Sequence, residues 1–290
     1  MAQFLGQLIR IPCRNASRLH ADPWRYSLKN EVVEGYRKSQ LSKDQVKTDK
    51  KLPVQSDQVK VGEYRHVYPE FLPHPNWMAR DRIREKLERS DMYKRRNVLH
   101  VPEFYVGSIM AVTVADQFAP LKKNRFVGIC ISRGGIGLKA NFTLRNVIAS
   151  QGIEIRYEIY QPHILNIEVL KLQKRLDDEL FYLRDAPPEY STVPFDFQPV
   201  SLPKGSEIPV DTTKVKLNPR PWLLRYERMD LKGVEDLNLP ERFYVKAKKV
   251  AKPWEKYDLM KDYRENVNDT DASEVYSEFS EHSSHFKGLK

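Results

Sequence analysis

The pattern of apolar and polar positions changes its period between residues 98 and 102 of this chain. Over residues 76–98 apolar residues recur at helical spacing, with Ile83 and Leu87 on one face and Asn76 at the expected N-cap. From Pro102 onward apolar and polar residues alternate, which is the period of a β-strand. The pattern therefore predicts a helix followed by a run of strands.

Turn residues, many of them glycine, separate the alternating stretches at intervals of about ten residues. This spacing favours a small β-barrel or sandwich and disfavours βαβ units, which need a helix between strands. The expected strands are residues 109–114, 126–131, 141–148, 153–160 and 164–172.

The first thirty residues have the pattern of a mitochondrial presequence. No acidic residue precedes Asp22, while Arg10, Arg14 and Arg18 supply positive charge. The apolar residues before Pro12 can form one face of a short amphipathic helix. This apolar stretch is too short for a secretory signal. The alternative is a disordered basic N-terminus without a targeting role.

Composition also separates the extensions on either side of the predicted barrel. Prolines spaced along residues 187–221 indicate an extended segment that wraps over another surface, and the last residues are rich in serine and acid. The predicted organisation is a presequence (1–30), a polar extension (31–75), a basic helix (76–98), a barrel (99–185), a Pro-rich C-terminal extension with a late helix (186–265) and a disordered acidic tail (266–290).

The charge balance points to a polyanionic partner. Lys and Arg number 49 against 39 Asp and Glu, which gives a formal net charge of +10. This excess alone does not separate RNA from DNA or an anionic membrane. The two cysteines argue against a disulfide framework and a Cys-based zinc site, and no apolar run is long enough to span a bilayer.

One motif suggests an enzyme, and its context argues against it. Residues 135–140 match the G-x-G-x-x-A pattern of dinucleotide-binding proteins, which requires a helix to open at the glycines. The stretch that follows, 141–148, is rich in β-branched and aromatic residues and favours a strand. His282 and His285 form an i, i+3 pair in the acidic tail, where such a pair is more often solvated than bound to a metal, and the other histidines lack partners at metal-ligand spacing. We therefore expect no catalytic residue, metal, cofactor, small-molecule substrate or membrane partner.

The basic residues are the stronger candidates for function. They gather at the end of the predicted helix and on the connections between strands, and in a small barrel these connections crowd together. Such a surface would bind RNA through its phosphates and 2′-hydroxyls, with steep salt dependence. The candidate RNA-binding residues are Lys94, Arg95, Arg96, Lys122, Lys123, Arg125, Arg133, Lys139, Arg145, Lys171, Lys174, Arg175 and Arg184.

An ordered series of short motifs resembles the bacterial-type large-subunit ribosomal protein family, number nineteen of that subunit, in a mitochondrial member. The resemblance covers about residues 102–184. Its marks are Pro102-x-Phe104 with Gly107, Lys122-Lys123, Phe126-x-Gly128, Gly137-Leu138, Phe142-Thr143-Leu144-Arg145, Gly152-Ile153-Glu154, Pro162 and Tyr182-Leu183-Arg184. One departure is that glycines and Ile136 stand where bacterial members carry arginines before the Gly-Leu pair, with Arg133 close by.

The resemblance implies a mainly β fold, an SH3-like barrel preceded by an α-helix, with long N- and C-terminal extensions. It implies a structural role on large-subunit rRNA near the face that meets the small subunit, with Lys122, Lys123, Arg145 and Arg184 as contacts. Neighbouring mitochondrial ribosomal proteins are expected partners of the extensions, and the mitochondrial matrix is the expected location. The alternatives are a non-ribosomal translation or assembly factor and, more remotely, a dinucleotide-binding enzyme.

Overall fold

The computed structural model describes residues 65–203 and 206–287, so the predicted presequence and most of the polar extension lie outside it. The α-helices of this part are α3 (Arg82–Val98), α4 (Glu241–Val250), α5 (Leu259–Glu265) and α6 (Asp269–Lys287). The strands are β1 (Ile109–Ala115), β2 (Lys123–Gly134), β3 (Asn141–Ile148), β4 (Gln151–Glu158), β5 (Ile164–Lys171), β6 (Lys174–Arg175) and β7 (Val210–Asp211). Short 3-10 helices are η2 (Pro69–Phe71), η3 (Trp77–Ala79), η4 (Gly137–Lys139), η5 (Phe181–Asp185), η6 (Pro188–Tyr190), η7 (Tyr226–Arg228) and η8 (Pro253–Tyr257).

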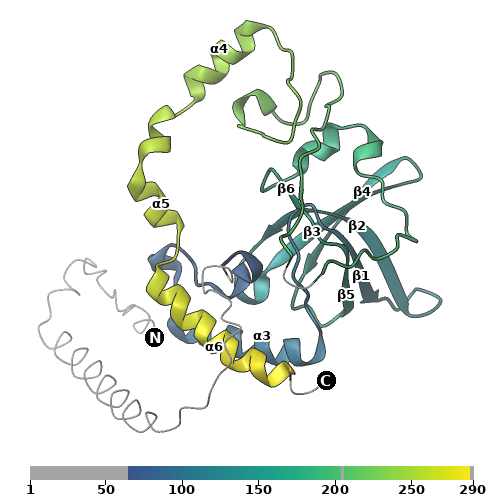
Figure 1. The fold of residues 1–290 in the computed structure, drawn as a ribbon, viewed down its shortest axis with the longest axis vertical. Coiled ribbons are helices and arrows are strands. Elements are labelled where there is room, and N and C mark those ends of the chain that lie inside the picture. The colour runs from purple at the N-terminus through teal and green to yellow at the C-terminus, as the bar shows by residue number, and fades with distance from the viewer. Residues whose placement is uncertain (1–64, 204–205, 288–290) are drawn as a thin grey trace, which may run out of the picture. The chain divides into compact units, whose positions relative to one another are not determined.

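Strands β1 to β5 form one antiparallel sheet in the order β4-β3-β2-β1-β5 (Figure 1). Strands β1 to β4 are successive neighbours, and β5 returns to pair with β1. Gly128 lets β2 approach β3 closely, because a Cβ at this position would lie 2.7 Å from the carbonyl oxygen of Arg145. The sheet and the helix before it confirm the predicted mainly β fold with an SH3-like barrel.

Both faces of the central strands are buried. In β1, Met110 and Val112 belong to one hydrophobic cluster, while Ile109 and Ala111 belong to a second one. Successive side chains of a strand point to opposite faces, so the two clusters lie on opposite sides of the sheet. Burial on both sides explains why β1 reads as a continuous apolar run without strict alternation.

The C-terminal extension covers the second of these faces. Its apolar residues join the cluster around β1 and β2, and they include Val193, Val215, Tyr226 and Val234. A buried amide fastens the extension, because the Asn146 Nδ2 group donates to the carbonyls of Val127 at 2.7 Å and Val193 at 2.9 Å. The surface that the Pro-rich segment wraps over is thus the protein's own sheet.

The last part of the chain differs from the predicted disordered tail. Residues 269–287 form α6, which lies beside α3 (Figure 1). Tyr276 and Phe279 of α6 are buried, and the ring of Phe279 lies 4.8 Å from that of Phe71 and 6.4 Å from that of Tyr93. The prediction of disorder is wrong for these residues.

The physical reason for this error is that the few apolar residues of α6 share one buried face, to which long-range charge pairs are added. The acidic residues of α6 face cations that precede or belong to the basic helix, in the pairs Arg65–Asp269 (3.0 Å), Arg80–Asp271 (2.6 Å) and Arg89–Glu278 (3.2 Å). The imidazole of His282, which the sequence placed in a solvated tail, stacks on the Tyr93 ring at 4.2 Å. Composition marks such a segment as polar, but only the fold shows that its partner is another charged helix.

The basic helix also starts later than predicted. Asn76 caps only η3, where its Oδ1 accepts a hydrogen bond from the Met78 amide at 3.0 Å. Asp81 then caps α3 by accepting from the amides of Ile83 and Arg84. Among the helices in the described ranges, none is both long and apolar enough to cross a membrane.

Candidate nucleic-acid interface

The exposed lysines of the barrel lie on its connections. Lys122 and Lys123 complete the turn between β1 and β2, and both are exposed to solvent. Lys122 adopts a left-handed conformation with φ of 53°, and the amide of Asp116 donates to its carbonyl oxygen at 3.1 Å. The turn is thus held by backbone hydrogen bonds, which leaves two ammonium groups to project from a fixed hairpin.

Two further exposed cations lie along α3. Lys139 ends η4, and η4 packs against α3, where the Glu88 carboxylate accepts a hydrogen bond from the Leu138 amide at 3.4 Å. Lys94 lies in the C-terminal half of α3, and its Nζ is 3.2 Å from the exposed Asp91 carboxylate. Exposed pairs of this kind are weak, so the Lys94 ammonium stays available to a phosphate.

Arg96 and Arg133 form a buried cluster around one carboxylate, which was not expected from the sequence. The Glu70 side chain is only 2% exposed and lies 2.6 Å from Arg96 and 2.8 Å from Arg133. The Arg96 guanidinium also stacks over Phe71 at 5.0 Å and donates to the Tyr160 hydroxyl at 3.0 Å. These two arginines hold the N-terminal segment on the barrel, and neither presents its charge to solvent.

Arg145 and Arg184 form a second cluster, around Glu154. Arg145 donates to Glu154 at 2.7 Å, and Arg184 reaches the same carboxylate through two nitrogens, the nearer at 2.6 Å. Burial disfavours the charged form of Glu154, but the hydrogen bonds and charges of Arg184 and Arg145 outweigh it, so its pKa is lowered. Arg145 is buried, whereas Arg184 keeps an exposed edge.

The remaining arginine candidates are also engaged with the protein. Arg175 is buried beside Asp211 at 3.4 Å and donates to the carbonyl of Thr213 at 3.2 Å. Arg95 donates to two carbonyls of the connection between β4 and β5 and, at 2.7 Å, to that of Ile164 at the start of β5. Arg125 donates to the Phe195 carbonyl at 3.1 Å but remains exposed. Arg96, Arg133, Arg145 and Arg175 therefore have side chains only 8 to 10% exposed and act as structural residues.

Two lysines at and after the end of β5 are partly buried. Lys171 ends β5 and is half-buried, and the Lys174 ammonium lies 4.0 Å from the centre of the Tyr105 ring. The set that the sequence predicted as one cationic surface is thus divided by the structure. Its exposed members are Lys94, Lys122, Lys123, Arg125, Lys139 and Arg184.

The Gly-rich connection does not open a helix. Gly137 starts η4, which lasts three residues, and β3 follows at once from Asn141 to Ile148. A dinucleotide site of the Rossmann type needs several free amides in the first turn of a helix at this point. The strand at Phe142 therefore contradicts the dinucleotide-binding hypothesis.

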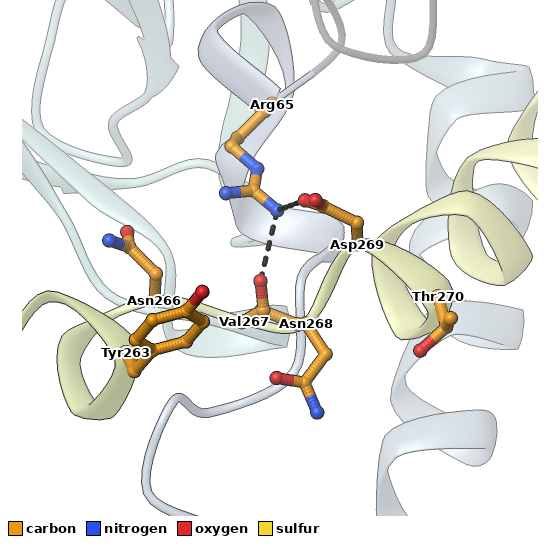
Figure 2. A pocket seen from close by; sticks show the side chains of 7 residues that line it. All are labelled: Arg65, Tyr263, Asn266, Val267, Asn268, Asp269 and Thr270. Carbon is orange, nitrogen blue, oxygen red and sulfur yellow. Dashed lines mark hydrogen bonds and ion pairs between the residues drawn. The ribbon is translucent and has the colours of Figure 1, made fainter. Parts of the chain in front are cut away.

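A cavity of about 500 Å³ lies where α5 meets α6 (Figure 2). Its lining residues are Arg65, Tyr263, Asn266, Val267, Asn268, Asp269 and Thr270. Arg65 donates to the Val267 carbonyl and the Asp269 carboxylate, both at 3.0 Å, so these groups are engaged with one another. Among the described residues, no three His, Cys, Asp or Glu side chains gather as a metal site. We therefore interpret the cavity as a junction between helices, lined by groups that bind one another.

Sequence reasoning missed Glu70 and the partners of the arginines. Glu70 stands in a stretch that reads as a polar extension, and no local pattern marks it as buried. The signal that was available is residue type: planar guanidinium groups suit buried pairing with carboxylates, whereas lysine is strongly hydrated and stays at the surface. Among the candidates, all four buried side chains are arginines, and four of the six exposed ones are lysines.

Comparison with known proteins identifies the family that has this barrel and helix. A model of the family described as Ribosomal protein L19 matches residues 83–193, which contain most of α3, the whole sheet and the start of the extension. The chain belongs to the ribosomal protein L19 family, as the resemblance predicted. It is similar to the Large ribosomal subunit protein bL19m of Drosophila melanogaster, with 53% identity over 228 residues, which is 78% of this chain and 74% of that protein.

Proposed function

We propose that this chain binds rRNA as a structural constituent of the mitochondrial large ribosomal subunit, near the face that meets the small subunit. The role in the large ribosomal subunit is supported by the 53% identity with bL19m, and this similarity extends well beyond the barrel. The structural role in that subunit and the mitochondrial location follow from this similarity. The site of contact and the proximity to the small subunit are parts of the proposal.

The exposed barrel cations are the proposed RNA contacts. The major groove of A-form RNA is deep and narrow, so a rigid hairpin reads RNA by its phosphates and by shape. Lys122 and Lys123 on the β1–β2 turn suit contact with phosphates, because hydrogen bonds fix the backbone of the turn and both side chains are exposed. Lys94, Arg125, Lys139 and the exposed edge of Arg184 extend the same chemistry to α3, β2, η4 and η5.

The buried Arg–Glu–Arg clusters support this function indirectly. One carboxylate neutralises part of the charge of two arginines, so each cluster fixes several segments, and of the four arginines only Arg184 keeps an exposed edge. Glu70 fastens the N-terminal segment to α3 and β2, and Glu154 fastens β4 to β3 and η5. The clusters thereby fix the elements from which the exposed lysines project. We propose no enzymatic activity for this fold.

Sedimentation of the endogenous protein tests the proposal. The protein should comigrate with the large subunit in stoichiometric amount and should stay there as the salt concentration is raised moderately. A translation or assembly factor built on the same barrel would be substoichiometric and would wash off in moderate salt. Recovery in the soluble top fractions at physiological salt would refute the proposal.

A further inference from the structure

A basic segment with exposed aromatic rings runs through the late helices. We call residues 242–257 the C-terminal arm; they comprise α4 after its first residue, the linker and η8. The arm contains six basic residues (Arg242, Lys246, Lys248, Lys249, Lys252 and Lys256) and one acidic residue, Glu255, which gives a formal charge of +5. This is half of the net charge of +10 of the whole chain, concentrated in sixteen residues.

One face of α4 anchors the arm to the rest of the protein. Phe243 and Ala247 are four positions apart, so they share a face, and Ala247 is buried. The ring of Phe243 lies 4.0 Å from the Arg220 guanidinium, and α4 packs against η7. The anchored face fixes the rotation of the helix about its axis.

An adjacent face of α4 carries the cations, and the Arg242 guanidinium lies 5.0 Å from the centre of the Phe243 ring. Arg242, Lys246 and Lys249 follow spacings of four and three, so they form one stripe along the helix. All three are exposed, and in the described ranges none forms an ion pair with a carboxylate. Lys248 and Lys249 lie in the last turn of α4, where positive charge interacts favourably with the helix dipole. The dipole therefore accounts for these two charges at most.

Two large aromatic rings follow this cationic stripe along the chain. Trp254 is 65% exposed and Tyr257 is 79% exposed, both within η8. Aromatic rings of this size normally bury most of their surface, and two exposed rings in one short element among the lysines of the arm suit a partner that stacks on them. Lysines that alternate with exposed rings are the combination that binds single-stranded or looped nucleic acid, where phosphates meet the cations and bases stack on the rings.

We infer that the C-terminal arm is a second RNA-binding surface, separate from the barrel, that grips phosphates with the α4 stripe and stacks an unpaired base on Trp254. Charge complementarity favours RNA over an apolar protein surface, because such a surface would have to desolvate five net charges. The inference rests on the proposed function, because that function supplies the RNA. Each lysine that binds a phosphate should add about 0.7 to 0.9 to the steepness of log Kobs against log salt, so its substitution should make the dependence shallower by that amount.

Ultraviolet crosslinking in intact large subunits tests the inference. The full chain replaces the endogenous protein, subunits are isolated at low salt, and RNA-attached peptides are mapped by mass spectrometry. The variants are K246E/K248E/K249E, with K246R/K248R/K249R as the control that keeps the charge, and Trp254→Ala, with Trp254→Phe as the control that keeps a ring. Crosslinks at Lys122 and Lys123 in the same subunits serve as the internal standard for barrel contact.

We expect RNA crosslinks in the arm of the wild-type chain and of both control variants. The glutamate variant should still cosediment with the subunit at low salt but should lose the arm crosslinks and be released at lower salt. Trp254→Ala should reduce arm crosslinking about tenfold, as expected for loss of one base–aromatic stack. Arm crosslinks to protein alone, or unchanged crosslinks in the glutamate variant, would overturn the inference while barrel crosslinks persist. Absence of the wild-type chain from the large subunit would instead overturn the proposed function.

Discussion

Arg96 points its guanidinium into the protein, where it lies 2.6 Å from the Glu70 carboxylate that sits 26 residues earlier in the chain. The same carboxylate holds Arg133, so one buried anion neutralises two cations from different elements. A charge removed from water needs such a partner, and removal of one member leaves the others buried without compensation.

Replacement of Glu70 by glutamine should therefore destabilise the fold strongly. The amide keeps the size of the side chain but leaves two buried guanidinium groups without an anion, at a cost of about 3 kcal/mol or more. Thermal and denaturant unfolding of the full chain would measure the loss. Glu168→Gln is the matched control, because Glu168 is exposed and pairs with Arg125 only at 3.5 Å, so its loss should cost about 1 kcal/mol or less. Equal stability of the two variants would contradict the structural role of the cluster.

Acid should weaken the second cluster through Glu154. Its pKa is lowered in the folded protein, where burial is outweighed by Arg184 and Arg145. The resulting stabilisation is complete above the pKa of the unfolded chain, about 4.3, and is lost as the pH falls through the lower folded-state value. The difference in unfolding free energy between wild type and Glu154→Gln should thus shrink below about pH 4.3. A difference that stays constant down to pH 2 would show that the carboxylate is not stabilised by its arginines.

Removal of an aromatic ring from α6 should show that the stability of the barrel depends on the end of the chain. Phe279 is buried against Tyr68, Phe71 and Tyr93, so Phe279→Ala should cost about 3 kcal/mol. Phe118→Ala is the control, since Phe118 is almost fully exposed in the turn between β1 and β2. If both substitutions change the unfolding midpoint equally little, α6 does not pack as described.

The thiol of Cys130 should be inert in the native protein. Burial raises the pKa of Cys130 to about 12, and the nearby Arg133 charge opposes this only partly. Alkylation requires the thiolate, so Cys130 should react slowly with iodoacetamide at pH 8 and rapidly once denaturant unfolds the chain. Peptide mapping by mass spectrometry separates this cysteine from Cys13. Rapid native alkylation would indicate that the interior of the barrel opens readily.

The barrel could be predicted from the sequence because its signals are local. Alternation, turn residues at regular intervals and the capped helical stretch each depend on neighbours in the chain, and the five strands lie where the pattern placed them. The order of the short motifs along the chain also indicated the protein family. Boundaries shifted by a few residues, as at Asp81, because two caps stand close together.

The roles of the individual cations could not be predicted, because they depend on partners far away in the chain. Arg133 meets Glu70 across 63 positions, and Arg80 meets Asp271 across 191. The acidic α6 was misread for the same reason: its low hydrophobicity suggested disorder, but its charges match those of the basic helix. The sequence alone does not tell whether an arginine in such a chain binds RNA or stabilises the fold. A lysine in a loop is more readily assigned to the surface.

The central claim is that exposed loop lysines dock this barrel on RNA while buried arginines maintain its fold. Incorporation of the K122E/K123E/K139E variant into large subunits, measured by sedimentation across a salt series beside a K122R/K123R/K139R control, tests it most directly. The account predicts that the glutamate variant unfolds at the wild-type temperature yet leaves the large-subunit fractions at lower salt, while the arginine variant behaves as wild type. Wild-type incorporation of the glutamate variant at every salt concentration would contradict it.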